Sequence, residues 1–302
     1  MIKYIKRKDL DVEKYNVCIE KSIQSKIYAF SWYLDVVTEN WSVFVYKDYN
    51  AVMPIPWKKK FFIKYGYPPF WLLELGVFSL DDKVDFQLFY KTLFDKFKFV
   101  ETRLNQKNNP NIASKHLINN QMQILKLDTD YPSILSNYRK DRKKDILKAS
   151  KNDLTEKWND DPVKLIDLFK ENIGKRTPNI LENDYNTVLT LMKLCIDKRV
   201  GEVLSIYDAH KNIVASGFFL KHKNEIIILI SSTDFKNRNN GANTFLIDRA
   251  IFKFEKNYTV FNFGGSTIKS VAKYFLSFGA ETLNYQHLKY NNLPFLFKLL
   301  KQ

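Results

Sequence analysis

Apolar and polar positions alternate along the chain with two periods, which together predict a mixture of strands and helices. In the second half, short runs rich in β-branched and aromatic residues are separated by longer segments whose apolar residues recur at helical spacing. The predicted order is a basic helix, a strand, two helices, three strands, a helix, a strand, a helix and a strand. The corresponding ranges are 136–151, 154–158, 163–172, 184–199, 203–207, 213–220, 226–230, 244–254, 259–263, 268–277 and 282–288.

The first half predicts a looser version of the same order. Strands are expected at 2–6, 42–46, 51–55, 65–78 and 99–104, and helices at 10–21, 28–34 and 82–97, before a polar loop at 105–114. A chain of 302 residues is long for one compact domain. We therefore predict two domains of the α/β class, at 1–130 and 131–302.

The most informative segment lies where a buried strand leads into a helix. A β-branched run ends at Ile230, a polar loop follows, and Arg238-Asn239-Asn240-Gly241-Ala242-Asn243 leads directly into the helix predicted from Thr244. Backbone N–H groups in the first turn of a helix have no intrahelical acceptor, and the helix dipole is positive there. The loop therefore predicts a pocket for an anion, most obviously a phosphate or pyrophosphate.

Composition narrows the class of protein. An apolar fraction of 45% can build sizeable cores, and no uninterrupted apolar run approaches the ~18 to 20 residues that span a bilayer. The N-terminus is charged and lacks the apolar core of a signal peptide, and Cys18 and Cys195 form no disulfide or zinc pattern. These features lead us to expect a cytoplasmic protein.

The net charge of +15 has two explanations. Only eight of the 48 basic residues are arginine and asparagine is abundant, so part of the excess can reflect an AT-rich genome and a merely solvated surface. Alternatively, the charge serves polyanionic substrates such as CoA, a nucleotide-sugar precursor or tRNA.

Two sets of residues carry a resemblance to a known family. Arg238 and Gly241 have the R-x-x-G spacing of the acyl-CoA pyrophosphate loop in the GNAT superfamily of N-acyltransferases, and the surrounding element order is similar to a complete GNAT domain. The basic helix at 139–149 and the strings at 261–266 and 274–280 resemble those of FemAB-like proteins, which contain tandem GNAT-like domains.

This resemblance implies a fold and a chemistry. It implies two tandem GNAT-like domains, each a mixed, mostly antiparallel sheet flanked by helices, the first domain degenerate. It also implies transfer of an acyl group from acyl-CoA to a small-molecule or peptide amine, with Arg238 to Asn243 holding the donor. FemAB-like proteins that act on peptidoglycan precursors use aminoacyl-tRNA instead, so both donors stay open.

One position departs from both family patterns. Phe275 stands where peptidoglycan-type members have a lysine and where GNAT enzymes usually have a tyrosine acting as general acid. Tyr274 carries the nearest hydroxyl, but adjacent helical positions point about 100° apart. Proton delivery then comes from another group, or the protein is a catalytically inactive GNAT-fold binding protein.

Other candidate catalytic residues follow the two central strands. Asp234 could be the base that deprotonates the acceptor amine, although an aspartate at this place more often caps a turn. Asn262 and Ser266 flank a glycine turn and could bind substrate, although Ser266 equally suits the N-cap of the next helix.

Further candidates concern substrate binding. Arg139 and Arg142 on the basic helix, and Lys175 and Arg176 after a later helix, could contact phosphates of a tRNA or nucleotide-sugar, or form a solvated face. The aromatic residues near proline turns could line a cleft between domains, but core packing is the commoner role; they are Trp32, Tyr33, Tyr67 and Trp71. The four histidines lack metal-site spacing, and the acceptor, pathway and oligomeric state are left open.

Overall fold

The computed structural model describes residues 2–60, 62–108, 110–177, 179–264 and 268–294. The chain divides into two compact units. Unit 1 comprises Met1–Asn120 and Asn284–Gln302, and unit 2 comprises Gln121–Leu283. The chain therefore passes from unit 1 to unit 2 within strand β7 (Leu117–Lys126) and returns within strand β13 (Glu281–Asn291).

Unit 1 is a mixed sheet with helices packed on it. Its strands are hydrogen-bonded in the order β1-β2-β3-β4-β6-β13, with β5 paired to β3. These pairs are antiparallel except for β4 with β6, which is parallel. The strands are β1 (Ile2–Lys6), β2 (Trp41–Tyr46), β3 (Ala51–Lys60), β4 (Ile63–Gly66), β5 (Phe78–Ser79) and β6 (Phe99–Arg103). The helices are α1 (Val12–Lys21), α2 (Ser31–Val37) and α3 (Gln87–Lys96).

The core of unit 1 collects the apolar faces of these elements. Phe44 on β2, Phe89 on α3, Val100 on β6 and Leu288 on β13 belong to one buried cluster, and each has no exposed surface. The contribution of Leu288 explains why the end of the chain folds with unit 1, because its strand pairs with β6 from His287 to Asn291.

Unit 2 is built around strands in the order β7-β12-β11-β10-β9-β8. Neighbouring strands are antiparallel except for β11 with β12. Besides β7, the strands are β8 (Thr155–Trp158), β9 (Gly201–Tyr207), β10 (Ile213–His222), β11 (Glu225–Thr233) and β12 (Val260–Asn262). The helices are α4 (Tyr131–Ser136), α5 (Lys140–Lys151), α6 (Pro162–Glu171), α7 (Glu182–Asp197), α8 (Ala242–Phe254) and α9 (Lys269–Leu276).

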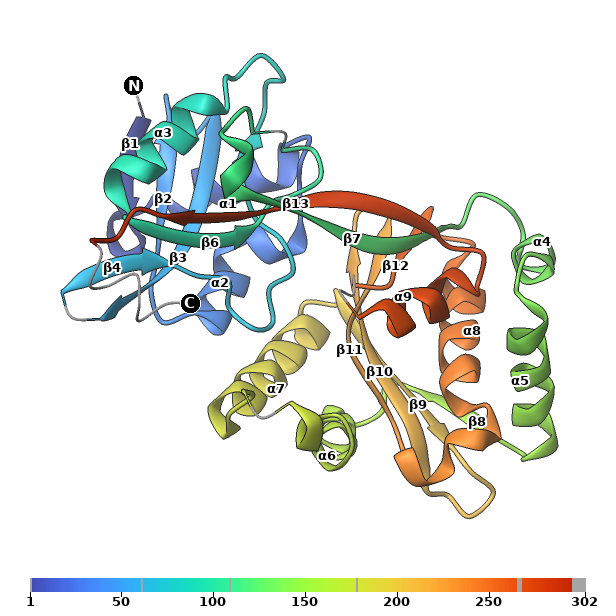
Figure 1. Ribbon diagram of the computed structural model, residues 1–302. Coiled ribbons are helices and arrows are strands. Elements are labelled where there is room, and N and C mark those ends of the chain that lie inside the picture. Colours follow the sequence, from blue (N-terminus) through green and yellow to red (C-terminus); the bar gives the residue numbers. More distant parts are fainter. Residues whose placement is uncertain (1, 61, 109, 178, 265–267, 295–302) are drawn as a thin grey trace. The chain divides into compact units, whose positions relative to one another are not determined.

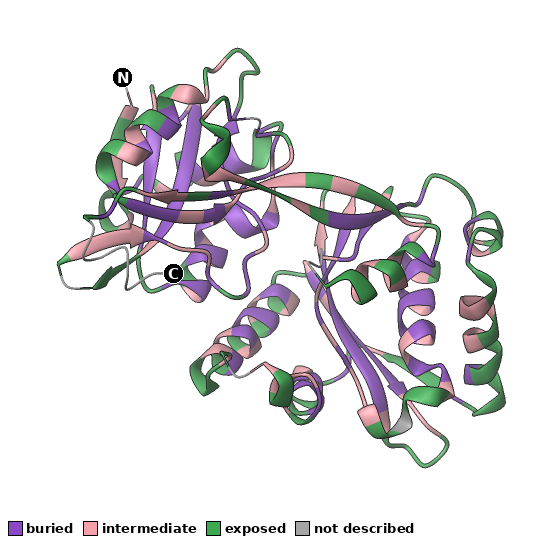
Figure 2. Ribbon diagram, viewed as in Figure 1, coloured by how far each residue is buried: buried purple, intermediate pink, exposed green. Residues whose placement is uncertain are grey.

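Helices cover both faces of this sheet. Figure 1 shows α6 and α7 on one side of β9, β10 and β11, and α8 on the other, with α5 packed outside α8. Figure 2 shows the strands between them buried along most of their length. The core on the α8 side includes Phe219, Phe254, Phe261 and Phe278, each at most 3% exposed. This layering places the start of α8 beside the end of β11.

Several predicted elements differ from the structure. The expected strand at 65–78 is wrong: β4 ends at Gly66, and the chain stays irregular until β5, because Pro68 and Pro69 cannot donate to a ladder. The basic helix predicted at 136–151 begins later, at Lys140, as α5, and a separate helix that was not predicted, α4, ends at Ser136. Strand β7 was not predicted, since its polar first half hides the alternation.

The missed strand bears on the domain boundary. The sequence places the boundary between residues 130 and 131, whereas the division in the structure falls at 120/121 and again at 283/284. Residues Ile124–Lys126 pair with Val260–Asn262 and so belong to the sheet of unit 2.

The described residues include no helix that is long and apolar enough to cross a membrane. Cys18 and Cys195 are buried free thiols, and burial raises the pKa of each to about 12.

Candidate functional site

Unit 2 contains a cavity of about 810 Å³ at the end of β11 and the start of α8. Its walls come from α5, the 3-10 turns Gly174–Arg176 and Phe235–Asn240, the end of β11, the first turn of α8, and α9. This volume falls within the range of about 300–1,000 Å³ that is typical of small-molecule sites.

The cavity exists because two parallel strands part. β11 pairs with β12 only from Glu225 to Ile227, and then continues to Thr233. On its other edge, β11 has a β-bulge against β10: Phe218 pairs with Ile230, whereas the next residue, Phe219, pairs with Ile228. Ser231, Ser232 and Thr233 lie beyond the last pairing with β12, and all three line the cavity. Such a splayed strand end leaves backbone groups available to a ligand.

The loop after β11 forms a compact turn before α8. Asp234 starts it, because its side-chain Oδ1 accepts a hydrogen bond from the N–H of Lys236 at 2.9 Å. Gly241 ends it with a left-handed φ of 85° and is the N-cap of α8. The first helical hydrogen bond runs from the N–H of Phe245 to the carbonyl of Gly241.

The first turn of α8 is only partly open to a ligand. The Asn240 side chain accepts from the N–H of Ala242 at 2.9 Å, so this donor is already satisfied. Asn243 and Thr244 follow in the same turn, where backbone N–H groups lack intrahelical acceptors, and both residues line the cavity. Two N–H groups and the positive helix end therefore face the space where an anion would bind.

Gly241 is required by packing. A Cβ atom at this position would lie 2.2 Å from the backbone oxygen of Asp145 and 3.2 Å from the backbone nitrogen of Ala149. Both atoms belong to α5, so only glycine lets α5 lie this close to the start of α8. The glycine of the R-x-x-G pattern thus has a structural reason that does not depend on a ligand.

Cationic side chains surround the cavity. Arg142 and Lys148 come from α5, Arg176 and Arg238 come from the two 3-10 turns, and Asp145 is the one carboxylate among the described lining residues. The guanidinium carbons of Arg176 and Arg238 lie 4.3 and 3.5 Å from the ring centroid of Phe235. Cation–π contacts of this kind orient both guanidinium groups on a shared ring. The balance of charge favours an anionic ligand.

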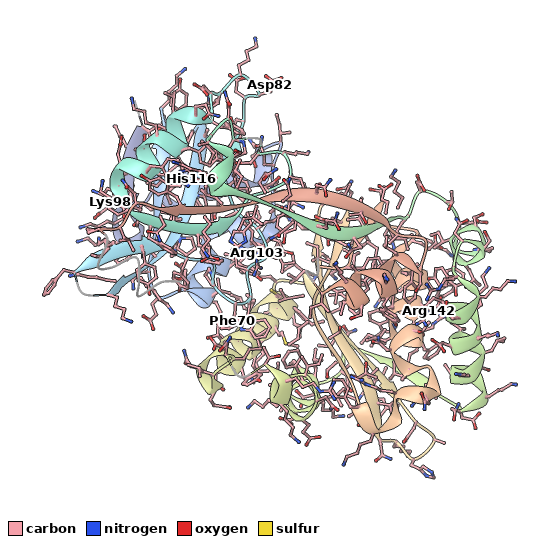
Figure 3. The ribbon with its side chains drawn as sticks, in the orientation of Figure 1. Phe70, Asp82, Lys98, Arg103, His116 and Arg142 are labelled. Atoms are coloured by element: carbon pink, nitrogen blue, oxygen red, sulfur yellow. The ribbon has the colours of Figure 1, made fainter. Side chains whose placement is uncertain are left out.

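Arg142 ties three helices together at the cavity. Its Nη1 donates to Thr244 Oγ1 at 2.8 Å and pairs with Asp145 at 3.0 Å, and its guanidinium lies 4.7 Å from the ring centroid of Tyr274. Figure 3 shows Arg142 between α5 and α8. The side chain is only 13% exposed, and within the described residues its Nε has no partner.

Tyr274 on α9 brings a hydroxyl to the same place. Its phenol oxygen lies 3.3 Å from Thr244 Oγ1. Burial raises the pKa of Tyr274 to about 12, so the phenol keeps its proton at neutral pH. Phe275 also lines the cavity, and its ring stacks on Phe263 at 4.7 Å between centroids. Although adjacent helical positions diverge by about 100°, Tyr274 and Phe275 thus reach the same cavity.

No family model matches the chain, and no curated protein matches it by sequence. Solved structures are similar over nearly its whole length. FemX is 10% identical with a TM-score of 0.68, covering 97% of this chain and 99% of that chain. L-PGS from Bacillus licheniformis is 14% identical with a TM-score of 0.57, covering 96% and 95%. A tandem GNAT protein from the clavulanic acid biosynthesis pathway is 8% identical with a TM-score of 0.53, covering 97% and 99%.

The chain therefore has the same fold as FemX and as this tandem GNAT protein. The predicted fold class is therefore confirmed. The cavity lies at the loop that the sequence predicts to bind the donor, between β11 and α8.

The structure brings together about half of the candidate site residues. Those that line the cavity are Arg142, Arg176, Arg238, Asn239, Gly241, Asn243 and Tyr274. Asn240 and Ala242 lie in the same loop but contact each other, and Ala242 is buried. Asp234 caps the turn, as its alternative interpretation holds.

The other candidates lie outside the lining. Asn262 is buried, donates to Glu225 at 2.8 Å and accepts from the N–H of Gly264. Arg139 is exposed and pairs with Asp141, and Lys175 is exposed beside Arg176. Ser266 lies outside the described residues. In unit 1, Tyr33 and Trp71 are buried, and the Tyr33 hydroxyl donates to the carbonyl of Trp71, which fits core packing.

Sequence reasoning missed several lining residues, and three of them, Thr244, Phe235 and Asp145, bear on the chemistry of the site. Thr244 and Phe235 border the recognised loop, and their positions in the first helical turn and directly after Asp234 could have suggested them. Asp145 was detectable only as the carboxylate three residues after Arg142 on the same helix face.

Proposed function

We propose that the chain is a GNAT-type N-acyltransferase whose acyl donor binds by its phosphates at the N-terminus of α8. The observation that supports this most is the meeting of an open helix N-terminus with four cationic side chains around one cavity. Acyl-CoA is the leading donor, because its pyrophosphate matches the charge and because the loop has the R-x-x-G pattern.

Under this proposal the residues divide the work. Asn243 and Thr244 donate backbone N–H groups to a phosphate, and Arg176 and Arg238 neutralise its charge while Phe235 orients them. Arg142 holds Thr244 and the ring of Tyr274 in place, since it contacts both.

Tyr274 serves as general acid in this proposal. The amine nitrogen of the acceptor attacks the acyl carbon, a C–N bond forms, and the C–S bond of the thioester breaks. The departing thiolate takes the phenolic proton, which burial keeps in place by raising the pKa of Tyr274 to about 12. The attacking nitrogen releases one proton to solvent as the amide forms, and the Tyr274 phenolate regains one proton from solvent. Phe275 then has a separate role, since its ring packs against Phe263 and shapes the wall.

Calorimetric titration with acetyl-CoA tests the donor. We expect binding that weakens roughly tenfold when Arg238 or Arg176 is changed to Gln, because each change removes a charged hydrogen-bond donor. Lys175→Gln is a matched control, since Lys175 is exposed, adjacent in sequence and absent from the lining. Failure to bind acetyl-CoA at millimolar concentration, or equal losses in the control, contradicts the acyl-CoA proposal.

Aminoacyl-tRNA is the second candidate donor. The full-length similarity to FemX favours it. So does Asn240, because its side chain already accepts a hydrogen bond from the N–H of Ala242, a group that would otherwise be available to a pyrophosphate. Two measurements separate the donors. Acetyl-CoA and a charged tRNA compete for the wild-type protein, and the affinity of each is then measured for the Arg238→Gln variant, where only the true donor should bind more weakly.

A further inference from the structure

The hairpin formed by β3 and β4 in unit 1 carries an unusual concentration of lysine. Its three last ladder pairs join Lys58 to Tyr65, Lys59 to Lys64, and Lys60 to Ile63. Lys59 and Lys64 are therefore direct cross-strand partners. Like charges at directly opposed positions destabilise a hairpin. We therefore look for a role of these lysines other than stabilising the hairpin.

An exposed aromatic ring lies at the end of this hairpin. Phe62 is 92% exposed, the highest value among the large apolar side chains of the described residues. Lys59 Nζ lies 5.4 Å from the ring centroid of Phe62. A phenyl ring held in water beside an ammonium group is typical of a contact surface.

More lysines approach from neighbouring elements. The pKa of Lys64 is lowered first by burial and then by the charges of Lys6, Lys96 and Lys59. Lys98, labelled in Figure 3, precedes β6, and the parallel pair Gly66 and Val100 places Lys98 beside Lys64 on the adjoining strand. Within the described residues, Lys6, Lys59, Lys64, Lys96 and Lys98 form no ion pair with a carboxylate.

Two aromatic side chains contact the lysines of the hairpin. Lys64 Nζ lies 4.2 Å from the ring centroid of Trp57, and Lys58 Nζ lies 4.5 Å from that of Tyr67. Trp57 is fixed to β2, because its indole N–H donates to Ser42 Oγ at 3.0 Å. The hairpin thus carries an apolar tip, then cations, then Trp and Tyr on a fixed base, the order of groups found where proteins enter a membrane interface.

We propose that this hairpin docks unit 1 onto an anionic lipid surface. A planar surface of negative headgroups would accept Phe62 into its outer layer while Lys58, Lys59 and Lys64 contact phosphates around it. A nucleic-acid strand is less suited, because such strands need a groove with a row of stacking rings. Here one ring is exposed at a tip, and the other two are covered by lysines.

Vesicle co-sedimentation of the full chain tests the proposal. We expect binding to phosphatidylcholine vesicles that contain about 30% phosphatidylglycerol, little binding to phosphatidylcholine alone, and loss of binding near 0.5 M salt, roughly, where charges are screened beyond a few ångströms. The Lys59→Gln/Lys64→Gln double variant should weaken partitioning about 25-fold, at about fivefold for each lysine. Phe62→Ser should weaken it roughly tenfold through lost insertion.

A matched control separates the hairpin from overall charge. Lys140→Gln/Lys144→Gln removes the same charge from exposed positions on α5 and should leave partitioning unchanged. Equal binding to neutral and anionic vesicles overturns the proposal, as does an equal loss in the control. Single-stranded RNA is the comparison ligand: if it binds and loses affinity in Phe62→Ser while vesicles stay unbound, the surface is a nucleic-acid site instead.

Discussion

Replacing Gly241 by alanine should destabilise unit 2 through one well-defined contact. The new Cβ would lie 2.2 Å from the backbone oxygen of Asp145, well inside van der Waals contact. That oxygen belongs to α5, so it cannot move without displacing the helix. Position 241 also has a φ of 85°, where residues other than glycine are strained.

The magnitude follows from these two terms. The left-handed conformation costs about 1–2 kcal/mol for a residue with a Cβ, and forcing an atom into a packed contact costs about 1–3 kcal/mol. The free energy of unfolding should therefore fall by roughly 2–5 kcal/mol. Urea unfolding followed by circular dichroism measures this loss, and hydrogen exchange should show faster opening of α5 and the start of α8.

Gly279→Ala supplies the matched control. Gly279 has a similar φ of 81°, but its Cβ would approach no atom closer than the side-chain Cβ of Asn137, at 3.1 Å, and would lie in ordinary contact with the backbone oxygen of Asn137, at 3.5 Å. This variant should lose mainly the conformational term, about 1–2 kcal/mol. If Gly241→Ala is no more destabilising than Gly279→Ala, the close approach of α5 is not what requires glycine at 241, and the reasoning fails.

Three further outcomes follow from the site and its surroundings. Tyr274→Phe should lower the rate of acyl transfer by about 100-fold while leaving donor affinity unchanged. Because burial raises the pKa of Tyr274 to about 12, wild-type activity should persist well above pH 10 on the alkaline limb of a pH–rate profile. Burial raises the pKa of Asp248, whose carboxylate accepts a hydrogen bond from Tyr131, so ionisation of Asp248 lowers the free energy of unfolding as pH rises above about 4. Asp248→Asn should remove this pH-dependent loss of stability. Urea unfolding at several pH values should show a difference in unfolding free energy between variant and wild type that widens with pH. Arg142→Ala should reduce the free energy of unfolding by about 1–3 kcal/mol, since it leaves partly buried partners unpaired. Arg139→Ala, at the exposed N-cap of the same helix, should leave the melting temperature unchanged.

The sequence determined the central strands and the site helix of unit 2 with good accuracy. β-Branched runs and helical spacing located β9, β10, β11 and α8 to within a few residues, because their periodicity reflects burial on one face or both. The loop from Arg238 to Asn243 was found for the same reason, since it interrupts a strong strand and begins a strong helix. Local pattern left Asp234 open between a catalytic base and a turn cap, and the structure shows it capping the turn.

Only the tertiary structure decided what that loop contacts. The reason for Gly241 lies about 100 residues away, in the backbone of α5, and no local pattern records such an approach. Phe275 looked like the loss of a catalytic group, yet Tyr274 reaches the same cavity from the neighbouring helical position. The assignment of β13 to unit 1 likewise rests on its pairing with β6, since a strand's own residues encode its faces but not its partner. The periodicity of the sequence thus determines the helices and strands, whereas the packing of one element against another depends on contacts between segments that are distant in sequence.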